Sequence, residues 1–216
     1  NDSSNIISTI NEVSNEFAVS STDLSLGLSK TSTAMATLGN TWSESVALMV
    51  GAGEQMPNQS GKIARGLRSI GLEIAKTAQT SKTLKVGLDG TEIALYDQEG
   101  AMRSTYDILK DLYPLWQNMS EQEKASLGLT IAKKNNYEVL SATMNGYGNV
   151  IKANEVALNS QGSAERENAK YMESMEGKAK LLKSSFSELV LGDGGLQSFA
   201  KLLLDIANVG MKALNT

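Results

Sequence analysis

Apolar residues recur every three or four positions in several short segments of this chain, and this period constrains the fold more than any other feature. The first segment has its periodic apolar residues at Ile6, Ile10, Val13 and Phe17. The second has its periodic residues at Leu24, Leu28, Thr31, Met35 and Leu38. Such spacing places each set on one face of an α-helix. The period therefore predicts a protein built from short amphipathic helices.

Capping residues mark where these helices begin and end. N-cap chemistry before the second helix is supplied by Ser21, Thr22 and Asp23. Gly39 ends that helix, and Thr41 and Glu44 then form a capping box, in which each side chain accepts a hydrogen bond from an otherwise unpaired backbone amide. Between about residues 20 and 79, these signals predict a loose repeat of helices paired as antiparallel hairpins.

The pattern changes after the fourth helix. Two glycine-containing turns interrupt the apolar residues between Leu84 and Met102, which predicts a small β-hairpin near residues 86–103. Helical spacing returns at Thr105 and ends near Pro114. A longer helix is predicted over residues 137–159, a second long helix follows it, and a last helix covers residues 196–214.

These signals define an all-α fold class of multiple helical hairpins, with two longer helices and the small β-hairpin. We expect a short-helix repeat over residues 1–83, an extended insertion over 84–104, and a helical region with long antiparallel helices over 105–216. Because the chain begins with Asn and no charged segment followed by an apolar one comes next, we expect no secretion signal in these residues. We therefore expect one continuous fragment of a larger protein.

Composition argues against most enzymes and cofactors. The chain has 216 residues, 24 acidic against 20 basic, and neither Cys nor His. Without these two residue types, zinc sites and Ser-His or Cys-His nucleophilic pairs cannot be built. Gly61 and Lys62 resemble the end of a phosphate-binding loop, but Ile63 stands where Ser or Thr would bind magnesium. We expect no enzyme activity and no cofactor.

Charge and hydropathy argue against two kinds of partner, nucleic acid and membrane. The net charge is −4, and no basic block is present that could neutralise a phosphate backbone. Sequence-specific nucleic-acid binding is therefore not expected. No apolar run approaches the roughly 20 residues that a membrane span needs, so membrane contact is not evident in this segment.

Three further segments carry motifs that periodicity alone does not explain. Residues 94–112 hold an extended element that leads into a helix and contains Tyr96, Asp97, Gly100 and Arg103. Residues 116–125 hold a helix start with Trp116, Ser120 and Glu123. Residues 162–174 open at Gly162. Before them lies an element of the form Arg-x-Leu-Arg, made of Arg65, Leu67 and Arg68.

In this order and at these separations, the motifs resemble the conserved core region of siphophage tail tape measure proteins. The resemblance extends over roughly residues 13–191, although the sequence around Asn135 and Asn136 lacks the small-residue turn of the family. It implies a structural scaffold that sets tail length, directs tail-tube assembly and is released during DNA ejection. It implies that the eleven motif residues above serve this scaffold rather than catalysis.

The same resemblance implies where the protein acts and with what. The expected location is the lumen of the virion tail, after assembly in the host cytoplasm. The expected partners are the tail-tube protein, tail-tip or baseplate proteins, and further copies of the chain in a homo-oligomer. The density of caps and glycines indicates a compact module rather than the long helical rod itself.

A different class of protein is also compatible with these helices. A secreted or surface-exposed helical module could use its hairpins for interaction or adhesion. An enzyme such as a peptidoglycan hydrolase is the weakest of the three hypotheses, because the sequence does not supply the catalytic groups.

Overall fold

The computed structural model describes residues 2–87 and 90–160. By its internal contacts the chain divides into two units, residues 1–163 and 164–216, and the described residues lie in the first. These residues form eight helices: α1 (Asp2–Glu16), α2 (Ser21–Thr37), α3 (Trp42–Gln55), α4 (Ser60–Ala78), α5 (Thr105–Asn118), α6 (Glu121–Ile131), α7 (Lys133–Asn145) and α8 (Tyr147–Asn159). Strands β1 (Thr83–Lys85) and β2 (Glu92–Ala94) pair as an antiparallel sheet. The fold is mostly α, as predicted.

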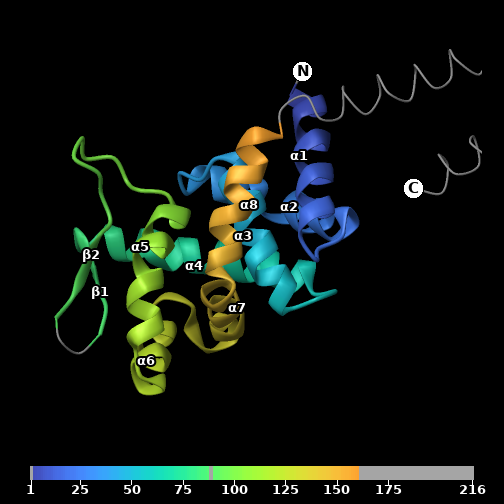
Figure 1. Ribbon diagram of the computed structural model, residues 1–216. Coiled ribbons are helices and arrows are strands. Elements are labelled where there is room, and N and C mark those ends of the chain that lie inside the picture. Colours follow the sequence, from blue (N-terminus) through green and yellow to red (C-terminus); the bar gives the residue numbers. More distant parts are fainter. Residues whose placement is uncertain (1, 88–89, 161–216) are drawn as a thin grey trace, which may run out of the picture. The chain divides into compact units, whose positions relative to one another are not determined.

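Helix α3 is the centre of the core. Every residue from Ser45 to Gly53 is buried, which is the pattern of a helix surrounded by other helices rather than one lying at a surface. Helices α8, α7 and α2 all pack against α3, and α4 packs against α2 and α7. Figure 1 shows α8 beside α3. Helix α1 lies beside the C-terminal part of α8, and the small sheet lies at the edge of the unit near α5.

The helix faces follow the predicted spacing closely. All five periodic residues of α2 are buried, as are Ile63, Leu67, Ile70 and Ile74 of α4. The capping boxes at Thr41 and Ser120 are both present. One cap prediction was wrong: the N-cap of α2 is Ser20, whose hydroxyl accepts from the Asp23 amide at 3.0 Å, so Ser21 already lies inside the helix.

The helix predicted over residues 137–159 is wrong as a single element. Gly146 ends α7 and begins α8, with φ −88° and ψ 7°. A methyl group on Gly146 would collide with the carbonyl oxygen of Gly51, so the two backbones touch where α3 meets the junction. Because the break is a single residue, the helical spacing of the apolar residues continues across it, and the sequence pattern does not reveal the break. The second of the two longer helices, the last helix and Gly162 lie outside the described residues.

Helix α5 does not end near Pro114 as predicted. It continues to Asn118 with the proline inside, although proline removes one helical hydrogen bond and crowds the preceding turn. Leu112 and Trp116, on either side of Pro114, are 0% and 1% exposed. Their burial outweighs the local preference, which is the usual outcome when propensity and packing disagree.

A small β-hairpin is present as predicted, but its strands lie earlier than the predicted bounds of 86–103, and β1 ends before residue 86. Thr83 pairs with Ala94, Leu84 with Ile93, and Lys85 with Glu92. Leu84 and Ile93 are buried on the face that packs against the helices. The remainder of the predicted β region, residues 95–103, forms a second and tighter turn.

Candidate functional site

Residues 95–103, which we call the motif hairpin, bring together four of the predicted motif residues. Tyr96 and Met102 form an isolated antiparallel bridge. Inside it, the Asp97 amide donates to the Ala101 carbonyl oxygen at 2.9 Å. Gly100 lies at φ +86°, in the left-handed region that favours glycine. The motif therefore encodes a defined turn rather than a flexible loop.

Asp97 closes this turn with its side chain. Its Oδ1 atom accepts hydrogen bonds from the Glu99 amide at 3.0 Å and from the Ala101 amide at 2.8 Å. An aspartate that binds backbone amides two and four residues later replaces the backbone acceptors that a tight turn cannot supply. The Asp and the Gly of the motif are thus explained by one local structure.

Tyr96 and Arg103 connect the motif hairpin to its neighbours. The Tyr96 hydroxyl donates to the carbonyl oxygen of Ala78 at 2.7 Å, and Ala78 is the last residue of α4, where carbonyl groups lack helical partners. The Arg103 guanidinium donates to the Ala94 carbonyl oxygen at 3.0 Å and pairs with Asp111 of α5 at 2.7 Å. The hairpin is held to α4, β2 and α5 by directed polar contacts.

The segment with Trp116, Ser120 and Glu123 forms the corner between α5 and α6. Trp116 lies in the last turns of α5 with its ring buried, and the Lys124 Nζ atom is 5.9 Å from the ring centroid. Ser120 is the N-cap of α6, and Glu123 accepts from the Ser120 amide at 2.9 Å. The predicted helix start is therefore at Ser120, and Trp116 belongs to the preceding helix.

The Arg-x-Leu-Arg element does not join these residues. Leu67 is fully buried in α4, whereas Arg65 and Arg68 are exposed on the outer side of the same helix. The structure therefore places Leu67 in the core and leaves the two arginines at the surface.

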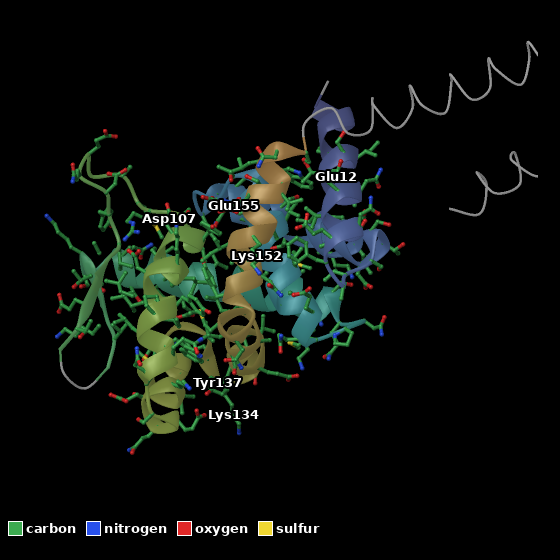
Figure 2. All side chains as sticks on the ribbon, viewed as in Figure 1. Glu12, Asp107, Lys134, Tyr137, Lys152 and Glu155 are labelled. Atoms are coloured by element: carbon green, nitrogen blue, oxygen red, sulfur yellow. The ribbon has the colours of Figure 1, made fainter. Side chains whose placement is uncertain are left out.

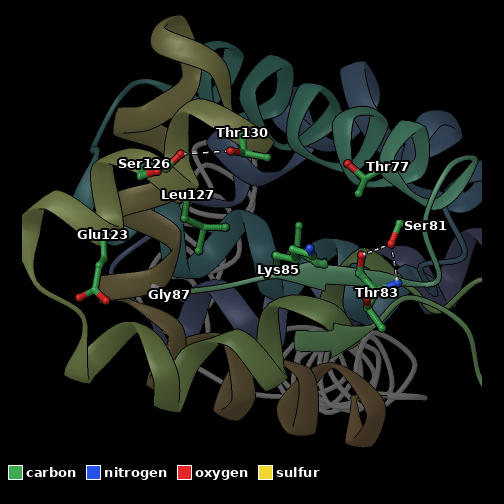
Figure 3. A pocket seen from close by; sticks show the side chains of 10 residues that line it. Thr77, Ser81, Thr83, Lys85, Gly87, Glu123, Ser126, Leu127 and Thr130 are labelled. Atoms are coloured by element: carbon green, nitrogen blue, oxygen red, sulfur yellow. Dashed lines mark hydrogen bonds between the residues drawn. The ribbon is translucent and has the colours of Figure 1, made fainter. Parts of the chain in front are cut away.

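A groove lies beside the sheet, between β1 and α6 (Figure 3). Its lining consists of Thr77, Ser81, Thr83, Leu84, Lys85, Gly87, Glu123, Ser126, Leu127 and Thr130. Most of its hydroxyl groups are used within the protein: Ser81 donates to the Thr83 carbonyl oxygen at 2.8 Å, and Thr130 to the Ser126 carbonyl oxygen at 3.1 Å. Glu123 is the motif residue that borders this groove.

The sequence model of the phage-related minor tail protein family matches residues 1–133. The chain belongs to this family. The matched residues span α1 to α6 and include the motif hairpin and the α5–α6 corner. No solved structure matches this chain.

The tail protein also contains buried polar contacts that sequence reasoning missed. Asn40 is 5% exposed, donates to the Met35 carbonyl oxygen at 3.0 Å and accepts from the Tyr106 amide at 2.9 Å. It thereby joins the end of α2 to the start of α5. The Tyr147 hydroxyl donates to the Tyr106 carbonyl oxygen in the same region. The sequence contains one signal for the Asn40 contacts, which is that this Asn lies directly between the helix-ending Gly39 and the N-cap Thr41.

Burial shifts the acidity of several groups around Tyr106. Burial, with smaller contributions from nearby carboxylates, raises the pKa values of Tyr106 and Tyr147. Figure 2 labels two of the carboxylates near Tyr106, Asp107 on α5 and Glu155 on α8. Burial also raises the pKa of the Glu44 carboxyl, against the opposing hydrogen bonds from Thr41. Both tyrosines therefore stay protonated at neutral pH, and the Tyr147 hydroxyl can donate its hydrogen bond to Tyr106.

Within residues 2–87 and 90–160, no group of three or more Asp, Glu, His or Cys side chains is arranged to hold a metal ion. None of the helices in the same ranges combines the length and apolarity that crossing a membrane requires.

Proposed function

We propose that this phage tail structural protein is part of a tape measure protein, and that residues 2–160 act as a folded module of it rather than as a stretch of extended ruler. The observation that carries the proposal is the motif hairpin. Tyr96, Asp97, Gly100 and Arg103 resemble the tape measure motif, and each has a contact or backbone conformation that builds one compact structure. These contacts form only where the chain folds.

The geometry of α3 supports the module over the rod. In a ruler made of one helix, each residue adds about 1.5 Å to the length, so the length is proportional to the number of residues. Here the chain reverses repeatedly and buries α3 among α2, α7 and α8. In this state the residues contribute to a packed core and add little to the length of the tail.

The roles that follow are those of an assembly module. We propose that it contacts the tail-tube protein and tail-tip or baseplate proteins, that it resides in the tail lumen in several copies, and that the full protein leaves during DNA ejection. We propose no catalytic role. Membership of a phage tail family supports these roles over those of a secreted adhesion module.

Electron microscopy of tails from phage carrying an in-frame deletion of residues 2–160 tests the proposal. If these residues were extended helix, tails would shorten by about 240 Å, at about 1.5 Å per residue. The module predicts absent or irregular tails without such a uniform shortening. Uniform shortening would contradict the module and retain the ruler, whereas normal tails would contradict the tape measure assignment.

A substitution that keeps the chain length unchanged separates the effect of losing the fold from the effect of shortening the chain. Gly146→Leu should prevent α7 and α8 from packing on α3, because the added side chain has no space against the Gly51 backbone. The module predicts the same assembly defect as the deletion. Gly148→Ala is the matched control, since the nearest atom to its added methyl group is the Tyr113 hydroxyl at 3.7 Å, and it should give normal tails.

A further inference from the structure

The outer edge of strand β1 borders the groove beside α6, and part of its backbone is unpaired. The Val86 amide donates to the Thr91 carbonyl oxygen at 2.8 Å, which fixes the pairing pattern of the two strands. In an antiparallel ladder, hydrogen-bonded residues alternate with residues whose backbone groups point the other way. Thr83 and Lys85 therefore direct their N–H and C=O groups away from β2 and toward the edge.

Thr83 and Lys85 differ in whether these outward groups have partners. The Ser81 hydroxyl donates to the Thr83 carbonyl oxygen at 2.8 Å and accepts from the Thr83 amide at 3.2 Å. Among the residues that the structure describes, none hydrogen-bonds to the amide or the carbonyl oxygen of Lys85. Folded proteins usually cover such an edge or pair it with another strand. The edge of β1 is thus closed at Thr83 and open at Lys85.

The groove next to Lys85 offers both space and suitable surface. Its volume is about 390 Å³, and Leu84 and Leu127 contribute apolar lining. Figure 3 shows Lys85 on one side of the groove and Leu127 on the other. The Lys85 side chain is exposed and pairs with no acidic side chain in residues 2–87 and 90–160. Glu123 borders the same groove, but its carboxylate accepts hydrogen bonds from Ser120.

We propose that this groove binds an extended segment of another protein, which adds to β1 as a third strand. One residue of the segment exchanges two backbone hydrogen bonds with Lys85, and its side chain lies on the same face as the Lys85 ammonium, where an acidic group complements the charge. The residues on either side point to the opposite face, on which Leu84 and Val86 are buried, so apolar side chains fit there. The expected segment has the order apolar, acidic, apolar.

The open backbone of Lys85 favours a peptide over other acidic ligands. A free carboxylate or a phosphate could pair with the ammonium and accept from the amide, but an ionised group of this kind has no donor for the Lys85 carbonyl oxygen. A peptide strand presents a donor and an acceptor side by side at the required spacing. The proposal concerns the sheet edge rather than the motif hairpin, and it does not require the tape measure assignment.

Titration of the intact 216-residue chain with the acetylated and amidated peptide Thr-Val-Glu-Val-Thr, followed by NMR, tests the proposal. The peptide should shift the amide signals of residues 84–87 and, at saturation, slow hydrogen exchange of the Lys85 amide by about tenfold. The same peptide methylated on its Glu nitrogen should not bind, because it cannot donate to the Lys85 carbonyl oxygen. Absence of shifts at residues 84–87, equal binding of the methylated peptide, or equal protection by acetate would overturn strand addition.

Substitutions at Lys85 separate its backbone from its charge. Lys85→Pro removes the outward amide, which an edge strand tolerates, and should weaken peptide binding by about tenfold or more. Lys85→Gln keeps the amide and should weaken binding by about twofold to fivefold, the value of an exposed ion pair. Lys82→Gln is the matched control, since Lys82 is exposed on the neighbouring turn and does not line this groove.

Unchanged amide signals in β2 show that each variant keeps the sheet. Full binding by Lys85→Pro would overturn strand addition, and equal weakening by Lys82→Gln and Lys85→Gln would overturn the acidic position in the segment. Either result leaves the tail-length experiment unaffected.

Discussion

The crossing of α3 with α8 and the hairpin region of residues 83–103 are stabilised in different ways. At the crossing, nearly all residues are buried and the backbones of Gly51 and Gly146 touch. In the hairpin region, Asp97, Gln98, Glu99 and Gly100 are exposed, and the structure depends on hydrogen bonds to Ala78, Ala94 and Ala101. One region is held by packing and the other by directed polar contacts.

This difference explains which residues resemble a family motif. Close packing can be satisfied by many combinations of apolar residues with similar volume, so a core leaves a weak signature of periodicity alone. A turn that needs a left-handed residue at Gly100 and a carboxylate at Asp97 accepts few alternatives. The recognisable motif therefore lies in the hairpin, although most of the buried apolar surface lies in the helices.

The largest expected effect is at the crossing. Gly146→Ala should reduce the free energy of unfolding by about 3 kcal/mol, the upper end of what overpacking usually costs, because the methyl group would meet the rigid backbone of Gly51. Urea unfolding measures the change. Gly148→Ala, with space for its methyl group in α8, should be neutral or stabilising by up to about 1 kcal/mol. Equal effects of the two substitutions would show that the close approach of the Gly146 and Gly51 backbones does not determine the stability.

The next effect concerns the attachment of the motif hairpin. Arg103→Ala should cost about 1–2 kcal/mol, because it removes a hydrogen bond to the Ala94 carbonyl oxygen and the ion pair with Asp111. Amide hydrogen exchange should show faster exchange at residues 94–103 and little change in α3. Arg103→Lys should restore only part of this protection, since a lysine lacks the planar fork that reaches both partners. Faster exchange throughout α3 would contradict a local role.

A smaller effect is expected at the turn itself. Gly100→Ala should cost about 1 kcal/mol, because a residue with a side chain disfavours φ +86°. No atom lies within 4 Å of the added methyl group, so the cost reflects backbone conformation alone. Gly100→Asn should be milder, since Asn tolerates the left-handed region. Thermal unfolding measures the stability of the two variants. A Gly100→Asn variant less stable than Gly100→Ala would contradict backbone conformation as the cause.

The smallest effect is the pH dependence of Glu44. Burial raises the pKa of its carboxyl in the folded state, so folding disfavours the ionised form. The contribution of Glu44 to stability is therefore greatest below the ordinary pKa of about 4.3, and it is lost as the pH rises through the raised value. Glu44→Gln keeps an acceptor for the Thr41 amide and should be as stable as the wild type or slightly more so at pH 7.

The difference between Glu44→Gln and wild type should shrink as the pH falls toward 4, because the wild-type carboxyl then becomes protonated as well. Chemical unfolding at several pH values measures it. A variant less stable than wild type at pH 7, with the gap closing at low pH, would show that the capping hydrogen bonds outweigh burial.

The sequence could predict those parts of the fold that depend on local patterns. Burial of the α2 residues Leu24, Leu28 and Met35 follows from a period of three to four, and the capping boxes at Thr41 and Ser120 follow from residue types at fixed spacing. Each of these features involves residues close together in the chain. Local physics is sufficient to specify them.

The features that could not be predicted depend on distant residues. The break at Gly146 is determined by Gly51, and the continuation of α5 through Pro114 by the burial of Trp116. At the candidate site, the sequence identified Tyr96 and Arg103 but could not assign their partners Ala78 and Asp111. Nor could it show that Arg65 and Arg68 lie apart from the hairpin.

Residue-resolved amide hydrogen exchange of the intact chain tests the central claim most directly, which is that residues 2–160 form a packed module around α3 with the motif hairpin attached by polar contacts. The account predicts the slowest exchange in α3, exchange of intermediate rate at the Ala101 and Arg103 amides, and faster exchange at exposed turns. Uniformly fast exchange, or protection no greater in α3 than in residues 83–103, would contradict it.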